Sequence, residues 1–299
     1  LREMHPDVVH LHNPALSVQM ALHVLFPRLP VVMTTHTLVT GRAQAHPFGP
    51  QAKRWWRGLL EMRLRRWIFV SQGQMEYAGN PPNGVVICNP MSFVPFEPGP
   101  VRLPELVGVP DGTPLIGSVG RMDWQKNPQS YSRVMCAVLR ERADMHAVVI
   151  GSGPKRDTEE SKAIVAANGV ADRFHFLGYR PDAATLVGDL NCFVMTSVWE
   201  GLPTSLLEAV RAHVPIAFME GKGGLVDLAR LNEKEGPLAV VAPQGDETGL
   251  AQGILRLLAQ PEEAKARAER AYTVARQRYA LEPAAQALEN LYRTVMAED

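Results

Sequence analysis

The sequence predicts an α/β protein with two doubly wound parallel sheets, and three observations lead to this prediction. At 299 residues the chain is long enough for two ordinary α/β domains. Short apolar runs alternate with amphipathic stretches of crossover length, which is the pattern of βαβ units. A proline-rich stretch at residues 89–114 interrupts this alternation and divides the chain into two parts.

The part of the chain from residue 114 onward shows the alternation most clearly. Helical patterns such as 128–143 and 203–213 separate its apolar runs. Because parallel sheets carry helices on both faces, these runs are interpreted as buried parallel strands. The six predicted strands are 114–119, 145–150, 173–177, 190–196, 214–219 and 238–242.

The first part of the chain repeats the theme less completely. Residues 1–7 resemble the end of a helix that runs directly into a strand, and a doubly wound domain rarely begins there. We therefore expect the first domain to be incomplete, either because the sequence is a fragment or because its start was assigned late. The four strands predicted here are 8–11, 31–35, 68–71 and 85–88.

The segment 89–114 is predicted to be the linker, because its seven prolines break both the helical and the strand periodicity. Two helices, near 262–279 and 282–296, follow the last strand, and a terminal helix of this kind can cross back to brace the first domain. The predicted organisation is a partial first domain at 1–98, a second domain at 99–279 and a crossing helix at 280–299.

Composition excludes several classes of protein. Lysine plus arginine equals aspartate plus glutamate at 31 each, so no global field is available to bind nucleic acid. Cys88, Cys136 and Cys192 are far apart and lack metal-type spacing, which predicts buried free thiols in a reducing cytoplasm. No apolar run approaches the roughly 20 residues of a membrane span, so we expect a soluble or at most peripheral protein.

The most specific motif is the segment 200–208, which carries two carboxylates eight positions apart. We expect Glu200 in the loop at the carboxyl end of a strand and Glu208 on the following helix, with Pro203 in its first turn. Both acids then face the crevice in which such sheets bind ligands. A carboxylate that accepts from two adjacent hydroxyls can bind a ribose or a hexose. The alternative is that Glu208 is a solvated helix residue and Glu200 a partner of the helix dipole.

Two features are suited to binding phosphate. The backbone amides of Thr204 and Ser205 lie at a helix start, where amides lack intrahelical partners. In the segment 117–127, Arg121 and Lys126 flank a loop that opens the next helix. Both cations can converge on a diphosphate whose charge grows as a sugar leaves. The alternative is that these loop cations are only solvated.

Together these motifs resemble those of the retaining glycosyltransferases of family 4, which have the GT-B fold of two doubly wound, Rossmann-like domains facing a cleft. The family's Gly-Arg followed by Lys five positions later is met by Gly120, Arg121 and Lys126. Its two glutamates separated by seven residues are met by Glu200 and Glu208. Further matches in the family's order cover nearly the whole chain, at residues 7–12, 34–36, 70–71, 89–90, 149–154 and 176–179.

The resemblance implies a role for each matched residue. It assigns the diphosphate to Arg121 and Lys126, the hydroxyls of the donor sugar to Glu200, and the ribose to Glu208. It implies retention of the anomeric configuration, no metal and no cofactor beyond the nucleotide-sugar co-substrate, with the departing diphosphate helping to accept the acceptor proton. The other residues that it places around the donor are Gly120 in the Gly-Arg motif, Tyr179 and Arg180 near the base, Gly201, Leu202, Pro203 and Thr204 in the acidic motif, and His36 near the donor sugar.

The sequence departs from the family pattern at three points: the first bears on transfer by this chain, and the other two on donor preference. The glycine-rich loop that follows the first strand of the N-terminal domain has no counterpart in the sequence. His213 stands where a glycine is common. The segment 224–227 places the shorter acid Asp227 where a glutamate is usual.

Two weaker motifs suggest other chemistry. His10 and His12 lie on one face of a strand, as do the first ligands of a metal-dependent hydrolase. Such an enzyme needs further histidines and an aspartate at later strand ends, and no such series follows residue 114. Residues 151–153 are Gly-Ser-Gly after a strand, but the third glycine of a dinucleotide-binding motif is missing, which disfavours a dehydrogenase.

The segment 53–67 interleaves cations with aromatic residues at helical spacing, as does a helix at a membrane interface. Gly58 and the continuation into a strand favour an ordinary packed helix instead. A peripheral contact with the inner membrane face through 53–67 therefore stays open.

The function predicted from the sequence is transfer of a sugar from a nucleotide-diphosphate-sugar to a hydroxyl of a glycan, a lipid or a small molecule. Two alternatives stay open: a sugar-nucleotide epimerase on the same fold, and a non-catalytic fragment that binds nucleotide-sugar. The sequence does not identify the sugar, the base or the acceptor.

Overall fold

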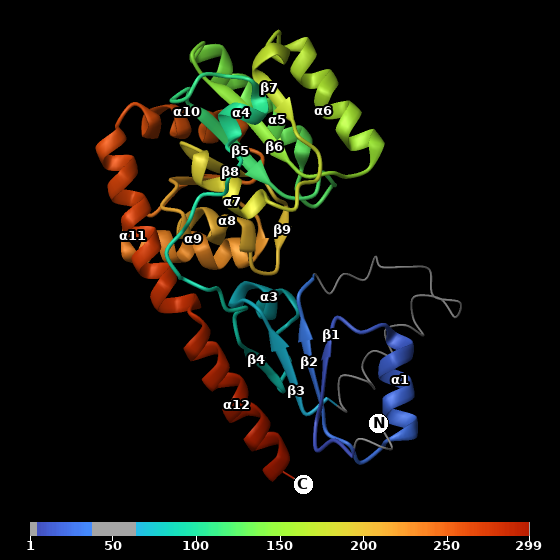
Figure 1. Ribbon diagram of the computed structural model, residues 1–299. Coiled ribbons are helices and arrows are strands. Elements are labelled where there is room, and N and C mark those ends of the chain that lie inside the picture. The colour runs from blue at the N-terminus through green and yellow to red at the C-terminus, as the bar shows by residue number, and fades with distance from the viewer. Residues whose placement is uncertain (1–4, 38–63, 299) are drawn as a thin grey trace.

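The computed structural model describes residues 5–37 and 64–298. Figure 1 shows two lobes, and each is built around a parallel sheet. The first lobe contains a four-stranded sheet in the order β1-β2-β3-β4, and the second a six-stranded sheet in the order β12-β10-β8-β5-β6-β7. The predicted α/β class with two parallel sheets is confirmed.

The first lobe uses the four strands expected from the sequence, with small shifts. Its strands are β1 (Val9–His12), β2 (Val31–Thr35), β3 (Arg66–Phe69) and β4 (Gly84–Val86), and its described helices are α1 (Leu16–Leu25) and α3 (Gln72–Tyr77). Strand β3 begins two residues earlier than predicted, so Arg66 and Trp67 are strand residues rather than the end of the predicted helix. Residues 53–63 of that helix lie outside the described residues.

The second lobe contains the six predicted strands. They are β5 (Leu115–Val119), β6 (His146–Ile150), β7 (Phe174–Phe176), β8 (Cys192–Met195), β10 (Ile216–Glu220) and β12 (Val240–Pro243). The sequence missed a second, two-stranded sheet of β9 (Trp199–Glu200) with β11 (Lys222–Gly223). The helices between these strands are α5 (Pro128–Glu141), α6 (Lys155–Ala167), α7 (Ala183–Leu186), α8 (Thr204–Arg211) and α9 (Gly224–Glu235), and α10 (Glu247–Leu258) follows the last strand.

The order of the six strands defines where a ligand can bind. From β5 the chain proceeds outward to β6 and β7, and then returns to the other side of β5 with β8. The sheet is therefore doubly wound, and its topological switch point lies between β5 and β8. Ligands of such sheets bind outside the carboxyl ends of the strands at this point.

Alternate residues of the central strands supply two separate cores. On β5, Leu115 packs in one core and Ile116 in the other, as expected for side chains that point to opposite faces. Helices α8 and α9 cover the first face, whereas α5 and α10 cover the second. Tyr131 of α5 donates to the backbone oxygen of Val148 at 2.7 Å, so the one polar atom of this buried ring is paired.

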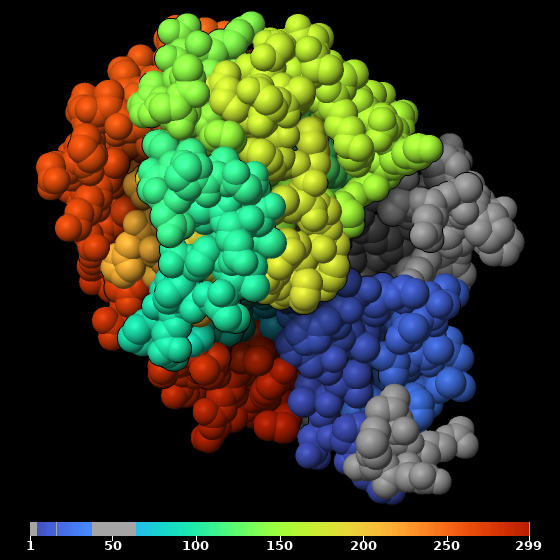
Figure 2. Space-filling model, turned by 45° about the horizontal axis from the view of Figure 1, so that its top comes forward, coloured from blue at the N-terminus to red at the C-terminus, as the bar shows by residue number. Residues whose placement is uncertain are grey.

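The linker predicted at 89–114 contains a short helix, α4 (Leu103–Val107), which was not predicted because prolines interrupt the helical periodicity there. Leu103 is fully buried against the second lobe, and its backbone N–H donates to Asp189 at 2.7 Å. Figure 2 shows the linker, coloured teal, lying on the surface of the second lobe. The linker is therefore packed rather than free.

The two C-terminal helices join the lobes. Helix α11 (Pro261–Tyr279) packs on the second lobe, and α12 (Leu281–Ala297) runs along the first (Figure 1). Val295 of α12 is fully buried in one cluster with Val32 of β2 and Ile68 of β3. The apolar face of α12 thus covers one face of the first sheet.

None of the helices in the described ranges is long and apolar enough to cross a membrane. The three cysteines are free thiols, and Cys136 and Cys192 are buried as predicted, whereas Cys88 is half-buried. Burial raises the pKa of Cys192 to about 12, so this thiol stays protonated at neutral pH.

The lobes also meet through Asp227, the acid noted above as a departure from the family pattern. Its two carboxylate oxygens accept from the backbone N–H groups of Gln72 and Gly73 at 2.7 and 2.8 Å. These amides open α3 of the first lobe, whereas Asp227 belongs to α9 of the second. One turn later, the exposed Arg230 pairs with Glu76 of α3 at 2.9 Å. The acid therefore serves the contact between the lobes.

We predict that Asp227→Ala lowers the free energy of unfolding by about 1–3 kcal/mol, because two amides lose a charged acceptor in a half-buried contact. Arg230→Ala removes only an exposed ion pair at the same contact and should cost less than about 1 kcal/mol. Urea unfolding of both variants measures the difference. Equal effects of the two changes would contradict this account of Asp227.

Candidate functional site

The centre of the candidate site is an ion pair between two loops. Lys126 Nζ donates to Glu200 Oε1 at 2.6 Å, and the side chains are only 21% and 7% exposed. Lys126 follows β5 and Glu200 follows β8, so the pair stands at the switch point of the sheet. The structure therefore brings together one residue of each predicted motif.

Backbone pairing fixes Glu200 more firmly than the predicted loop would. Glu200 lies in β9, where it is the register partner of Gly223 in β11. The side-chain amide of Gln125 donates to the backbone oxygen of Trp199 at 3.1 Å, and the N–H of Val198 donates to the backbone oxygen of Gln125 at 2.8 Å. The loop that carries Lys126 is thus bound directly to the segment that carries Glu200.

Glycines allow the loop after β5 to lie against its neighbour after β6. A Cβ at Gly151 would overlap the backbone oxygen of Gly120, and a Cβ at Gly153 would overlap that of Met122. The N–H of Met122 donates to the backbone oxygen of Ser152 at 3.0 Å. The Gly-Ser-Gly stretch, which resembles part of a dinucleotide motif, therefore has a packing role in this fold.

The start of α8 differs in part from the prediction. Pro203 lies immediately before the first helical residue rather than within the first turn. The amide of Thr204, which was expected to be free for phosphate, donates to the backbone oxygen of Leu202 at 2.9 Å. Leu202 itself is buried in the core.

Glu208 lies one turn into α8, with a half-buried side chain. Burial raises the pKa of its carboxyl group, and the nearby Arg211 opposes this shift only in part. A partly buried acid with a raised pKa is suited to hydrogen bonding with a ligand. The side chain of Glu208 is thus half-buried rather than fully solvated.

The remaining predicted residues of this lobe are more exposed. The side chain of Arg121 is 68% exposed and pairs with Asp123 of its own loop at 2.8 Å. Tyr179 is 76% exposed, and Arg180 pairs with Asp182 at 2.8 Å. Gly178 connects this last loop to the one after β6, because its backbone oxygen accepts from the N–H of Gly151 at 2.7 Å.

The first lobe contributes His36, which follows β2. A Cβ at Gly201 would overlap the backbone oxygen of His36, so the two backbones touch where the lobes meet. His36 Nε2 lies 2.9 Å from His12 Nδ1, and its Nδ1 lies 3.3 Å from the side-chain nitrogen of Asn89. The structure therefore places His36 directly beside the segment that carries Glu200.

Comparison with known families agrees with this geometry. The family described as "Glycosyl transferases group 1" matches residues 113–260, and "Glycosyltransferase Family 4" matches residues 1–90. The chain belongs to glycosyltransferase family 4. Together the two matches include both lobes and both motifs.

Individual relatives and solved structures support the assignment. A 2-deoxystreptamine glucosyltransferase of Streptomyces kanamyceticus is 34% identical over 163 residues, which cover 54% of this chain and 40% of the relative. A lipopolysaccharide core biosynthesis mannosyltransferase, LpcC, of Rhizobium leguminosarum is 29% identical over 195 residues, which cover 64% and 54%. This family-4 chain thus spans about half the length of these relatives, or less.

Solved structures share the fold over nearly the whole chain. Anabaena HepE, solved in complex with UDP and glucose, has a TM-score of 0.79 at 18% identity and covers 94% of this chain and 77% of its own. Sucrose-phosphate synthase of Thermosynechococcus elongatus has a TM-score of 0.79 at 19% identity and covers 98% and 74%. The fold of this family-4 chain is therefore of the GT-B type.

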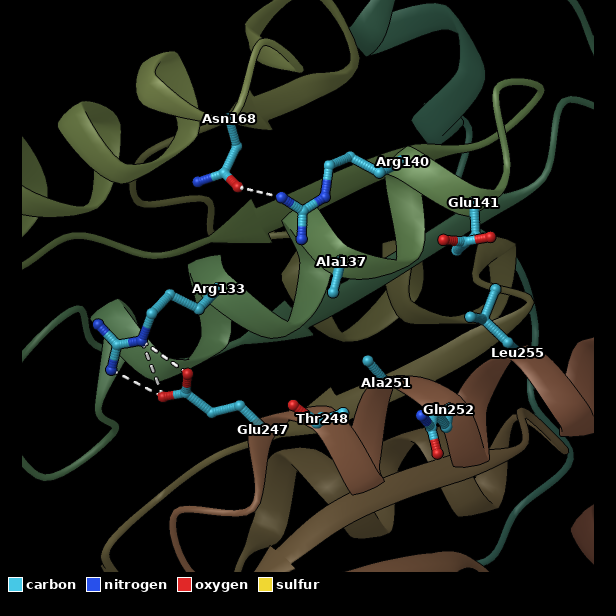
Figure 3. Close-up of a pocket in the computed structure, with 10 residues that line it drawn as sticks. All are labelled: Arg133, Ala137, Arg140, Glu141, Asn168, Glu247, Thr248, Ala251, Gln252 and Leu255. Atoms are coloured by element: carbon cyan, nitrogen blue, oxygen red, sulfur yellow. Dashed lines mark hydrogen bonds and ion pairs between the residues drawn. The ribbon is translucent and has the colours of Figure 1, made fainter.

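A hollow of about 420 Å³ lies between α5 and α10, away from the Lys126–Glu200 pair. The Arg133–Glu247 ion pair joins the two helices at one end, and Arg140, near the end of α5, donates to Asn168 at 2.9 Å (Figure 3). None of the residues assigned to the donor lines this hollow.

Within residues 5–37 and 64–298, no group of three or more His, Cys, Asp or Glu side chains is arranged to hold a metal ion. His10 and His12 do share a strand face, but their ring nitrogens contact Tyr292, Thr34 and His36. The predicted pair is therefore engaged in protein contacts.

Sequence reasoning missed Gln125, Asn89 and His12 as parts of the site. Gln125 lies inside the recognised loop but matches no charged pattern, and its role depends on a contact 74 positions away. Asn89 and His12 fall within stretches that resemble the family, which is the signal that could have drawn attention to them.

The raised pKa of Glu208 predicts a pH dependence of stability. In the unfolded chain the carboxyl titrates near its ordinary 4.5, whereas the folded protein binds the proton more tightly. The contribution of Glu208 to the free energy of unfolding therefore falls as pH rises from about 4.5 through the folded pKa. Glu208→Gln, which carries no titrating group, should gain stability relative to the native chain between pH 4 and pH 7. Thermal unfolding at both pH values measures this, and a constant difference would contradict it.

Proposed function

We propose that the chain transfers a glycosyl group from a nucleoside diphosphate sugar to an acceptor hydroxyl. The observation that carries the proposal is the Lys126–Glu200 pair at the switch point, with Glu208 on the next helix. A cation suited to a diphosphate stands next to an acid suited to sugar hydroxyls. This order matches that of a sugar diphosphate, in which the sugar and the phosphates are directly bonded.

The reaction breaks the bond between the anomeric carbon and the diphosphate oxygen. Negative charge then grows on the diphosphate, and Lys126 and Arg121 stabilise it in a partly water-excluded site. The acceptor oxygen bonds to the anomeric carbon on the face that the diphosphate leaves, and the departing phosphate oxygen takes the acceptor proton. The configuration is thus retained without a covalent link to the protein.

Two further features support the proposal. The relatives named above are glycosyltransferases, which favours transfer over epimerisation. The HepE structure contains UDP and glucose, so uridine nucleotides are the first donors to test. Because Arg121 and Lys126 supply positive charge at the diphosphate, we also propose that turnover needs no divalent metal.

Replacing the two acids should separate the binding of nucleotide from that of sugar. Glu208→Ala should weaken UDP binding by about 1.5–3 kcal/mol, because a charged hydrogen-bond acceptor for the ribose is lost. Glu200→Gln keeps an oxygen that can accept from Lys126, and should leave UDP binding nearly intact while weakening binding of UDP-glucose. Calorimetry with both ligands tests this, and equal losses for Glu200→Gln would rule out its contact with the sugar.

Replacing Lys126 or Arg121 by alanine should weaken binding of UDP more than binding of UMP, because both cations act on the second phosphate. The difference should shrink as salt is added, more so for the exposed Arg121. Arg140→Ala, at the hollow between α5 and α10, is the matched control and should change neither affinity. A requirement for added divalent metal would argue against this proposal and for a metal enzyme. A sugar altered by incubation of the donor with the chain and no acceptor would argue for an epimerase instead.

A further inference from the structure

Four polar side chains share one face of the first sheet. His10 and His12 are two positions apart on β1, so they point to the same side, as do Thr34 of β2 and His36, which directly follows β2. Helix α12 covers this face, since Val295 packs on Val32. The side chains form a histidine column, defined here as His10, His12 and His36, with its His36 end at the contact between the lobes.

The contacts along the column are close. The rings of His10 and His12 stack with centroids 4.4 Å apart, and those of His12 and His36 with centroids 5.2 Å apart. His10 Nδ1 lies 2.5 Å from the hydroxyl of Tyr292, and its Nε2 lies 2.7 Å from that of Thr34. The far end of the column is thus anchored to α12.

The partners of His36 specify its tautomer. The side-chain nitrogen of Asn89, at 3.3 Å, can only donate, so His36 Nδ1 accepts. A neutral imidazole then carries its proton on Nε2, from which it donates to His12 Nδ1 at 2.9 Å. The backbone N–H of His36 also donates to Asn13 at 2.8 Å, which fixes the position of the residue.

The charge state of the column agrees with this assignment. Burial lowers the pKa of His36, and the neighbouring His12 lowers it further. Burial also lowers the pKa of His10 to about 4, with smaller contributions from His12 and His36. Both groups are therefore neutral at pH 7, and a neutral ring has one donor and one acceptor.

We propose that His12 and Asn89 are positioning residues that hold His36 as its Nε2–H tautomer, ready to donate to a hydroxyl of the donor sugar. The sugar as ligand rests on the proposed function; the tautomer does not. His12 is exposed, so a hydroxyl oxygen that enters the site can replace His12 Nδ1 as the acceptor of the His36 N–H group. The backbone oxygen of His36 lies against Gly201, the residue that follows Glu200 in the chain.

The tautomer has a consequence for specificity. An Nε2–H group needs an acceptor atom, which a hydroxyl provides and an ammonium group does not. The site should therefore take a neutral, hydroxylated sugar at this position and discriminate against deoxy sugars, which lack the oxygen. Removing His12 should weaken that discrimination.

Nitrogen-15 NMR of ring-labelled histidine tests the tautomer directly in the full chain, with the signals of His36 assigned by their loss in His36→Gln. We expect the Nε2–H pattern in the native chain and a mixture of tautomers in His12→Phe, which keeps a stacking ring but removes the acceptor nitrogen. His12→Asn, whose side-chain oxygen accepts, should restore the single tautomer. Calorimetry should show UDP affinity unchanged in His12→Phe and UDP-glucose affinity lowered about fivefold or more.

The chain offers a matched control in its other lobe. His146 Nδ1 lies 2.9 Å from His175 Nε2, and the rings stack at 5.2 Å, as in the His12–His36 pair. His146→Phe should change neither the spectrum of His36 nor the affinity for UDP-glucose. A proton on Nδ1 of His36, or a His12→Phe spectrum like that of the native chain, would overturn the proposal. The Nε2–H pattern in a chain that binds no UDP or UDP-glucose would instead reject the proposed function and the sugar contact while preserving the histidine arrangement.

Discussion

A buried carboxylate and a mostly buried ammonium group meet at 2.6 Å where the chain reverses its winding direction, and much of the surrounding structure serves this contact. Breaking such a pair costs on the order of 3–5 kcal/mol when both charges are fully buried, because one charge is left without a partner. The loops that carry Lys126 and Glu200 must therefore be held together. Gln125 joins them through its side-chain amide, which donates to Trp199, and its backbone oxygen, which accepts from Val198. Strands β9 and β11 fix the backbone of Glu200.

Glycine makes this arrangement possible at the points of closest approach. Gly151 and Gly153 let the loops after β5 and β6 touch, and Gly201 lets the second lobe touch His36. At each place a single Cβ would overlap a backbone oxygen, which cannot move as a flexible side chain can. The Gly-Ser-Gly stretch at 151–153, which resembles part of a dinucleotide-binding motif, is in this chain a site of backbone packing. Position in the fold, rather than spacing alone, separates the two uses.

The sequence predicted what depends on periodicity and missed what depends on distant partners. All ten strands of the two main sheets were predicted from short, mostly apolar runs, because strands of a parallel sheet covered by helices are largely buried. The two-residue strands β9 and β11 have no period to detect and form only because their segments lie side by side. The amide of Thr204 was expected to be free, but Pro203 directs the chain so that this amide meets Leu202. Asp227 was predicted to bear on donor preference, whereas its carboxylate accepts from backbone amides 154 and 155 positions away.

The hydrogen-bonding capacity of the central pair explains how a substrate can enter without breaking it. An ammonium group has three donors, and Lys126 uses one on Glu200; a carboxylate has about four acceptor positions, and Glu200 uses one on Lys126. The remaining donors can bind a diphosphate and the remaining acceptors can bind sugar hydroxyls while the pair stays intact. On the proposed function, the bond between sugar and phosphate then spans the Lys126–Glu200 contact. The polar groups that stabilise its cleavage are in place before the donor arrives, so little free energy is lost in rearranging them.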